Sequence, residues 1–273
     1  IQRSFAAFEH IEELFVEPME EEGRKLLSTE QVAPQLTEFH SLVFNNVSFR
    51  YTPALPYVLK NVSFVLKKGE KIALVGSTGS GKSTIIRLIA KTYQDYEGSI
   101  LLNGIELAEI SVEDCIHLFS LMMQDVYLFE ESIRFNIALG NPNISASQVE
   151  QAGRYVYADN FIQHLPNGYD FCLDKNGTNL SNGQTQLISF ARSVAQGGQV
   201  MMLDEATSSV DSITENLIQK AMQRLFSEKT VIAIAHRLST IAAMDRLIVL
   251  DKGQIIEQGS HEELIRSNGV YAQ

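Results

Sequence analysis

A glycine-rich loop that follows a short apolar run constrains the fold of this chain more than any other feature. The run is "KIALV", the loop "GSTGSGKS" covers residues 76–83, and "STIIRLIA" continues with helical periodicity. The spacing G-x-x-x-x-G-K-[ST] is typical of a loop whose backbone N–H groups surround a polyphosphate. This interpretation requires a strand before the loop and a helix after it, and both can be read in the sequence. The alternative is a flexible Gly/Ser loop that contains a lysine by chance.

Each residue type in this loop has a physical role. Glycines let the backbone approach phosphate without a Cβ clash, and the following helix offers a partial positive charge at its N-terminus. Lys82 is expected to reach the β and γ phosphates, and the Ser83 hydroxyl is expected to ligate Mg²⁺. The predicted nucleotide-binding residues of the loop are Gly76, Ser77, Thr78, Gly79, Ser80, Gly81, Lys82, Ser83 and Thr84.

A second apolar run, "VMMLDE", ends in an acidic pair. We expect Asp204 to hold Mg²⁺, directly or through water, and Glu205 to polarise an attacking water. Such a pair alone is also typical of a solvated strand end. Because a phosphate loop is present in the same chain, the functional interpretation is favoured, and the two elements together predict a P-loop nucleoside triphosphatase.

The composition limits the classes of partner. The formal net charge is −11 and no run of Lys and Arg occurs, which disfavours nucleic acid as a ligand. The two cysteines, Cys115 and Cys172, lack metal-ligand spacing and are predicted to be free thiols in a reducing compartment. No stretch approaches the roughly 18 apolar residues of a membrane helix. The chain begins with Ile1 rather than Met, so we expect it to be a piece of a longer protein.

The pattern along the chain predicts an α/β fold. Residues 1–16 have the spacing of an amphipathic helix, and residues 17–37 are acidic, contain Pro and Gly, and are interpreted as a linker. From Phe39 onward, strand-like runs alternate with helical stretches, which favours a largely parallel sheet with flanking helices. The last such run, "RLIVLDKGQIIEQG", is expected to form buried strands.

A block from roughly 112 to 195 is interpreted as a helical insertion. Within it, Ser145 and Gln148 have the spacing of a capping box at the start of a helix. The expected organisation is a tail and linker over 1–37, followed by one domain over 38–273.

The pentapeptide "LSNGQ" opens a further helix, with Ser181 placed as its N-cap. It resembles the signature motif, usually written LSGGQ, of the ATP-binding cassette (ABC) ATPases, and it ends about 20 residues before Asp204. The resemblance implies that Ser181, Gly183 and Gln184 contact a nucleotide held by a second domain.

Other segments resemble ABC motifs in the same order. The resemblance implies that Tyr51 stacks on adenine and that Gln124, in the Q-loop, also ligates the metal. It further implies that Asp211, in the D-loop, lies at the nucleotide and that His236, the switch histidine, takes part in catalysis. The segments "LFEESIRFNIALG", "GQIIEQGSHEELIRSNGVYAQ" and "QRSFAAFEHIEELFVEP" resemble parts of ABC exporters, so the resemblance covers nearly the whole chain.

This resemblance implies a P-loop core with an antiparallel β subdomain and a helical insertion, binding ATP and Mg²⁺. It implies catalytic roles for Lys82, Gln124, Glu205 and His236, and metal contacts from Ser83, Gln124 and Asp204. The partners would be a second ABC domain, bound head to tail, and transmembrane domains, with this chain at the cytoplasmic face of a membrane. Two alternatives stay open: a soluble ABC ATPase acting on nucleic acid or ribosomes, and a regulatory domain with little turnover. The sequence does not identify the exported substrate.

Three positions depart from the family pattern. Asn182 replaces the second signature glycine, Lys175 occupies the place of a glutamate, and Thr185 stands where arginine is common. Because asparagine tolerates positive φ better than other non-glycine residues, we expect the replacement of this glycine by Asn182 to have a smaller effect. The combination of an altered signature and an intact Glu205 is compatible with a heterodimer of two different ABC domains and with a homodimer.

Overall fold

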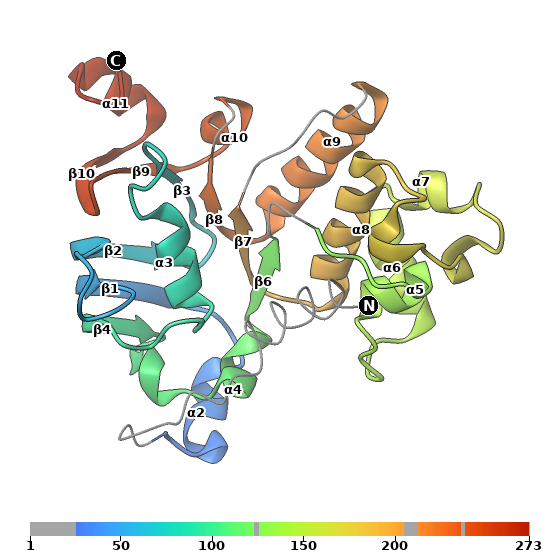
Figure 1. The fold of residues 1–273 in the computed structure, drawn as a ribbon, viewed down its shortest axis with the longest axis horizontal. Helices are drawn as coiled ribbons and strands as arrows, with labels where there is room; N and C mark the ends of the chain where they lie inside the picture. Colours follow the sequence, from blue (N-terminus) through green and yellow to red (C-terminus); the bar gives the residue numbers. More distant parts are fainter. Residues whose placement is uncertain (1–25, 123–125, 205–211, 236–237, 273) are drawn as a thin grey trace.

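Two β-sheets and a group of helices make up the described part of the chain (Figure 1). The computed structural model describes residues 26–122, 126–204, 212–235 and 238–272. The helix that we expect over residues 1–16 lies outside these ranges.

The larger sheet has six strands in the order β10-β9-β3-β8-β7-β6, and all neighbours except β9 and β10 run parallel. Apolar side chains fill its central strands, and every residue of β8 is buried, as expected when both faces of a parallel sheet are covered. The strands are β3 (Lys71–Val75), β6 (Phe119–Met122), β7 (Val200–Asp204), β8 (Thr230–Ile234), β9 (Arg246–Asp251) and β10 (Gln254–Gly259).

One edge of this sheet differs from the expectation that the last run forms buried strands. β10 pairs antiparallel with β9 and alternates between exposed and half-buried residues. Lys252 and Gly253 join the two strands with φ values of 46° and 82°, as a tight two-residue hairpin turn requires. The prediction of burial was therefore wrong for β10, because an outer antiparallel strand can expose one face to water.

The smaller sheet is antiparallel, in the order β2-β1-β4-β5. Its apolar side chains share one core with helix α3 (Lys82–Ile89) and with one face of the parallel sheet. α3 therefore packs between a sheet that carries the phosphate loop and a second sheet that supports it. The strands are β1 (Ser41–Phe49), β2 (Leu59–Lys67), β4 (Glu97–Leu102) and β5 (Ile105–Glu106).

Part of the expected linker is instead a helix, α2 (Thr29–Leu36). Val32 and Leu36, four residues apart, are fully buried in the core of the antiparallel sheet. Leu36 O also lies 2.9 Å from His117 Nε2. The linker interpretation is wrong over this stretch, because acidic neighbours masked an apolar helix face that the core covers.

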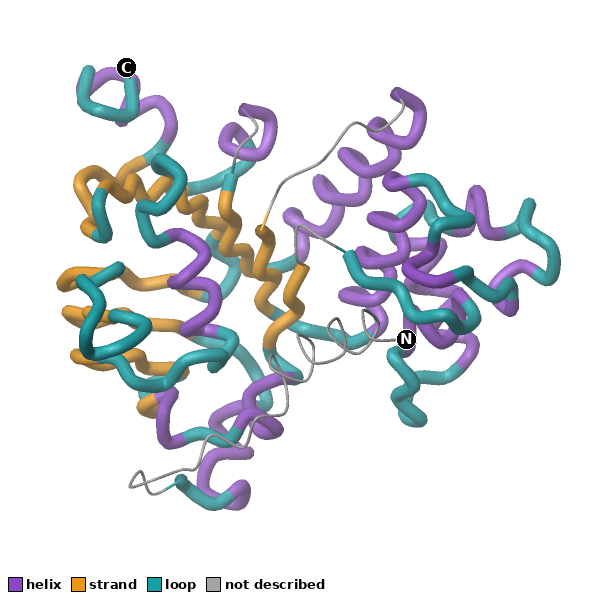
Figure 2. The backbone as a smooth tube through the Cα atoms, in the orientation of Figure 1, coloured by secondary structure: helices purple, strands orange, loops and turns teal. Residues whose placement is uncertain are grey.

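The helical block begins later than residue 112. α4 (Val112–Ile116) packs beside α2, and β6 belongs to the parallel sheet, so the helices of the block follow β6. They gather beyond the β6 edge of that sheet, on the side opposite the antiparallel sheet (Figure 2). They are α5 (Ile133–Ala138), α6 (Ala146–Tyr155), α7 (Asp159–Ile162) and α8 (Asn182–Ala195), with single 3₁₀ turns η2 (Gly168–Asp170) and η3 (Lys175–Gly177). The capping box of Ser145 and Gln148 is confirmed.

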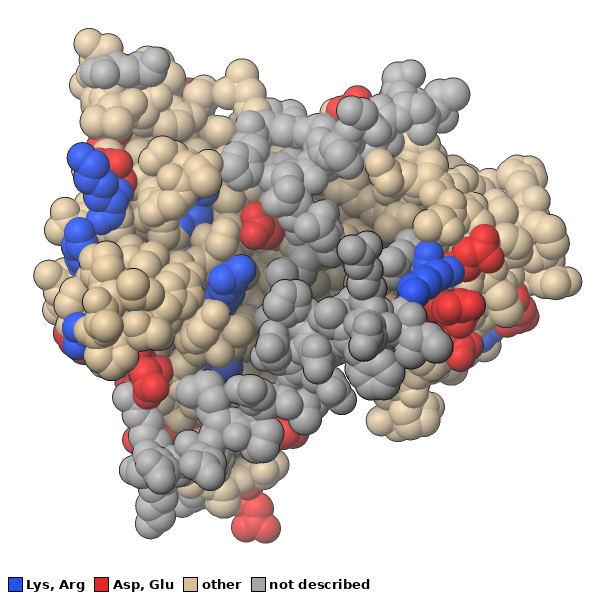
Figure 3. All heavy atoms as spheres, viewed as in Figure 1, with Lys and Arg blue, Asp and Glu red and all other residues tan. Residues whose placement is uncertain are grey.

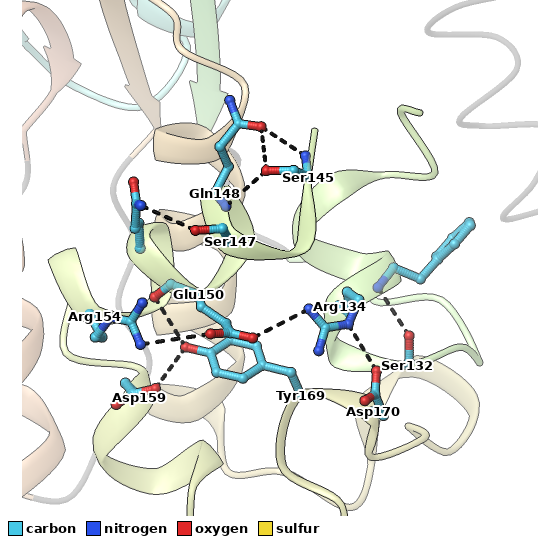
Figure 4. A network of polar contacts seen from close by, with 12 residues as sticks. Ser132, Arg134, Ser145, Ser147, Gln148, Glu150, Arg154, Asp159, Tyr169 and Asp170 are labelled. Atoms are coloured by element: carbon cyan, nitrogen blue, oxygen red, sulfur yellow. Dashed lines mark hydrogen bonds and ion pairs between the residues drawn. The ribbon is translucent and has the colours of Figure 1, made fainter. Parts of the chain in front are cut away.

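A polar network joins the helices of this block (Figure 4). Arg134 Nε donates to Asp170 Oδ1 at 2.9 Å, and the Tyr169 hydroxyl donates to Asp159 Oδ1 at 2.9 Å. A Cβ added to Gly153 would lie 2.1 Å from the Tyr169 hydroxyl, so only glycine lets α6 approach this ring. Burial and the Asp159 carboxylate both raise the pKa of Tyr169, which keeps its hydroxyl a donor.

Further helices complete the described chain, and no described helix is both long enough and apolar enough to cross a membrane. Cys115 is buried and Cys172 exposed, and both thiols are free as predicted. The remaining elements are α9 (Ser212–Glu228), α10 (Leu238–Ala242), α11 (His261–Ser267) and the 3₁₀ turn η1 (Leu107–Glu109).

Candidate functional site

The phosphate loop connects β3 directly to α3, as the sequence predicts. Gly76, its first residue, has a φ of 147°, and a Cβ there would lie 2.2 Å from Leu250 O. The main chain of β9 therefore fills the space that a side chain would need. Gly79 has a φ of 80° and faces open space. The first of these two glycines permits close packing, and the second permits the curvature of the loop.

The Lys82 side chain is buried inside this loop and only 6% of its surface is exposed. Its ammonium donates to Gly76 O and Ser77 O, both at 2.8 Å. Burial lowers the pKa of the Lys82 ammonium, and the Asp204 carboxylate opposes that shift. The loop thus surrounds one cation with main-chain acceptors, at a place where phosphate oxygens could replace them.

The N-terminus of α3 adds further donors. Its N-cap is Gly81, which supplies no side-chain cap. The first backbone N–H groups of a helix lack intrahelical partners, and the helix dipole favours an anion near them. Together with the Lys82 ammonium they form an arrangement suited to a polyphosphate.

The structure brings together Ser83 and Asp204, two of the three predicted metal contacts. Ser83 Oγ lies at the start of α3 and donates to Asp204 Oδ2, at the end of β7, over 3.4 Å. Hydroxyl and carboxylate oxygens suit Mg²⁺, which usually takes one or two protein ligands beside phosphates and water. The described residues contain no cluster of three or more His, Cys, Asp or Glu that could hold a metal alone. This pair therefore fits a magnesium ion that is bound together with a nucleotide.

Tyr51 lies beside the same helix. Its hydroxyl is 2.9 Å from Thr84 Oγ1, and its ring meets Tyr93 edge-on at 5.3 Å between centroids. The Tyr51 residue is 38% exposed. Its stacking on adenine stays a prediction, and its position next to the phosphate loop is compatible with that role.

The signature segment opens α8 in the way that the sequence predicts. Ser181 Oγ accepts from Gln184 N at 3.3 Å, and Gln184 Oε1 accepts from Ser181 N at 2.9 Å, so the N-cap prediction is confirmed. Asn182 is the first helical residue, and it is absent from the residues with positive φ. The expectation that its tolerance of positive φ matters is therefore wrong, because this position has helical backbone angles. Gly183 is buried in the first turn of the helix.

Four predicted site residues, Gln124, Glu205, Asp211 and His236, lie outside the described residues. Two of them follow strands whose ends are described. β7 ends at Asp204, directly before Glu205, and β8 ends at Ile234, two residues before His236. Asp204 pairs in register with Ile234, which pairs in turn with Leu74 of β3. The strands that lead to these residues therefore end at the same sheet edge as the phosphate loop.

The β9–β10 turn also supports this site, which no sequence motif indicated. Gly253 N donates to Ser80 O at 3.1 Å, and Gly253 O accepts from Lys60 N at 2.8 Å. The "DKG" turn signal was readable, but its contact with a loop more than 150 residues earlier depends on the sheet order. The family departures Lys175 and Thr185 lie respectively in η3, exposed, and in the first turns of α8, half-buried.

Comparison with known proteins yields one consistent family. A family model described as "ABC transporter" matches residues 59–208. A Legionella pneumophila protein named ATP-dependent lipid A-core flippase is 39% identical over all of this chain, which covers 45% of that protein. A Streptococcus pneumoniae protein named as a putative ABC transporter ATP-binding protein is 40% identical over 97% of this chain and 43% of its own length.

A solved structure gives the same result for the fold. The structure of a bacterial Atm1-family ABC exporter with ATP bound superposes on all of this chain with a TM-score of 0.81 at 34% identity. This chain covers 46% of that one, and it spans about two fifths of the length of the curated relatives. The expected α/β class with a second, antiparallel sheet and a helical block is thereby confirmed.

Alanine substitutions at Gly76 and at Gly79 should distinguish the effect of close packing from that of loop curvature. We expect Gly76→Ala to lower the free energy of unfolding by about 1–3 kcal/mol more than Gly79→Ala, because its Cβ meets the Leu250 carbonyl whereas the Gly79 position is open. Gly79→Ala is the matched control, since it introduces only the strain of positive φ, about 1–2 kcal/mol. Denaturant unfolding measures both, and equal destabilisation would contradict the close-packing argument.

Proposed function

This chain belongs to the ABC transporter family, and we propose that it is the ATP-hydrolysing domain of an ABC exporter. The observation that carries this proposal is the meeting of Lys82, Ser83 and Asp204 at one sheet edge, together with a capped signature helix in the same chain. The names of its relatives support transport as the purpose of hydrolysis. No substrate is proposed, because relatives of similar identity are named for lipid A-core and for leukotoxin.

The residues of the chain divide the work of binding and hydrolysis. Lys82 gives up the carbonyls of Gly76 and Ser77 and donates to the β and γ phosphates instead. Ser83 and Asp204 would hold Mg²⁺, which supplies neutralisation of phosphate charge when it is bound. Glu205, directly after Asp204, orients the attacking water and accepts its proton.

Hydrolysis by this proposal requires a partner domain. A second ABC domain binds head to tail, and its signature residues complete the site that Lys82 begins. Gln124 would add a metal contact, His236 would stabilise the charge on the γ-phosphate, and Asp211 would contact the nucleotide. This chain would lie at the cytoplasmic face of the membrane and pass the resulting motion to transmembrane domains.

The alternative of an ATPase that acts on nucleic acid or ribosomes has less support. The net charge is −11. On the face shown in Figure 3, Lys and Arg side chains lie in small separate groups, several of them beside Asp or Glu. The described residues on this face form no continuous basic surface for a phosphate backbone. A regulatory domain with little turnover is opposed by the presence of Glu205.

Glu205→Gln tests the catalytic assignment. We expect MgATP affinity within about twofold of the unmodified chain and a fall in steady-state hydrolysis of at least about 100-fold, because the amide cannot accept the proton of water. Glu262→Gln is the control, because Glu262 is exposed and pairs with Arg266 on α11. It should leave both values unchanged. Unchanged turnover in Glu205→Gln would remove this residue from the proposed role.

Asn182→Gly tests whether the chain works with a copy of itself. If the chain normally pairs with a different ABC domain, its homodimer should hydrolyse ATP slowly. The glycine variant should then raise the rate several-fold, because the exposed Asn182 side chain would no longer stand between the helix start and the partner's nucleotide. Rapid, cooperative hydrolysis by the unmodified chain, with no gain in the variant, would instead favour an ordinary homodimer. The measurement is the ATPase rate as a function of protein concentration.

A further inference from the structure

Residues 127–132, which we call the strap, connect the segment after Gln124 to helix α5. The strap forms an antiparallel bridge between Ser132 and Cys172, and Leu173 N donates to Glu131 O at 3.0 Å. The strap is therefore attached along one side to the chain that leads toward the signature segment. This attachment is made of main-chain bonds, so it does not depend on the side chains at these positions.

The side chain of Asn136 fixes the shape of the strap from within α5. Asn136 is fully buried. Its Oδ1 accepts from Phe129 N at 2.8 Å, and its Nδ2 donates to Phe129 O and Ser132 O, both at 3.0 Å. Because a buried amide must satisfy its donors and its acceptor, the strap can hardly change shape while Asn136 stays in place.

Arg192, on the last turn of α8, reaches across to this same unit. Its Nε donates to Asn136 O at 2.9 Å, and its Nη2 donates to Tyr127 O at 3.2 Å. Burial lowers the pKa of the Arg192 guanidinium to about 10, so it stays charged at neutral pH. Within the described ranges it has no ion pair with a carboxylate, and its charge is met by main-chain carbonyls instead.

The chain that precedes the signature segment also contacts the strap. Gly177 ends η3, four residues before Ser181, with a φ of 65°. A Cβ added there would lie 2.8 Å from Leu128 Cδ1, and Leu128 is fully buried. The strap is thus held both before the signature residues and at the far end of the helix that they open.

We propose that Arg192 is a positioning residue, which ties the signature helix to the strap so that a displacement of the chain after Gln124 is passed on to Ser181. A guanidinium suits this task because its planar fork bonds two carbonyls of different segments at once. Without it, α8 keeps its apolar contacts with α5 but can pivot on them. This inference rests on the proposed function, since it assumes that the signature meets the nucleotide of a second domain.

A merely structural role for Arg192 makes a different prediction, and the chain offers a matched control. Gln196, the C-cap residue of α8 and four positions beyond Arg192, donates from Nε2 to Ala138 O at 3.0 Å. This bond joins the same two helices at a similar depth, but it does not reach the strap. If Arg192 only fastens α8 to α5, replacing either residue should have the same consequences.

The experiment compares Arg192→Met, Arg192→Lys and Gln196→Met by thermal unfolding, MgATP titration and ATPase kinetics. For Arg192→Met we expect MgATP affinity within about twofold of the unmodified chain and kcat at least about tenfold lower, because the loop of Lys82 is untouched while the signature is misplaced. Arg192→Lys, which has one ammonium in place of the fork, should be intermediate. Gln196→Met should keep kcat within about twofold at a comparable melting temperature. Equal losses of kcat in Arg192→Met and Gln196→Met, or unchanged kcat in Arg192→Met, would overturn the proposal.

Hydrogen exchange provides an arm that needs no catalysis. The amides of Phe129 and of the first turn of α8 should exchange at least about tenfold faster in Arg192→Met than in Gln196→Met, because only the first variant removes a hydrogen bond between α8 and the strap. If Arg192→Met does not fold, Arg192→Lys carries the same comparison. An unmodified chain that does not bind MgATP would contradict the proposed function, whereas equal exchange in the two variants would contradict the tie itself.

Discussion

The burial of one lysine ammonium constrains the site more than any other interaction. A cation removed from water must be surrounded by acceptors, or its burial costs several kcal/mol. Lys82 meets this requirement with the carbonyls of Gly76 and Ser77. Those carbonyls point inward because Gly76 packs against Leu250, and Gly253 holds the loop by a bond to Ser80 O. Phosphate oxygens are charged acceptors, so they can replace the carbonyls with stronger bonds.

The sheet order converts this local arrangement into a site. β3, β8 and β7 are neighbours and parallel, so the phosphate loop, Asp204 and the end of β8 reach the same edge, although they are far apart in the sequence. The antiparallel sheet covers α3 from the other side and brings Tyr51 to Thr84. The signature segment belongs to the helical block instead, at the start of α8. Under the proposed function, it contacts the nucleotide of a second domain.

Patterns in the sequence correctly predicted the structural features that depend on neighbouring residues. The strand before the loop, the helix after it, and the caps at Ser145 and Ser181 depend on neighbouring residues, and all four are confirmed. The features that were predicted wrongly depend on packing between distant parts of the chain. The helix over 29–36 exists because the core covers Val32, and β10 is half-exposed because it is an outer strand. No sequence pattern indicated that Arg192 bonds the strap. The roles of Gln124, Glu205, Asp211 and His236 stay predictions.

The most direct test of this account is the affinity of the chain for MgATP before and after the ammonium is removed. Calorimetric titration of the unmodified chain should show one site per chain. Lys82→Met should bind about 10–100-fold more weakly, since a charge-assisted hydrogen bond contributes about 1.5–3 kcal/mol. Its circular dichroism spectrum should be unchanged, which shows that the fold remains. Equal affinity in the two proteins, with the fold intact, would contradict the claim that the loop holds Lys82 for phosphate.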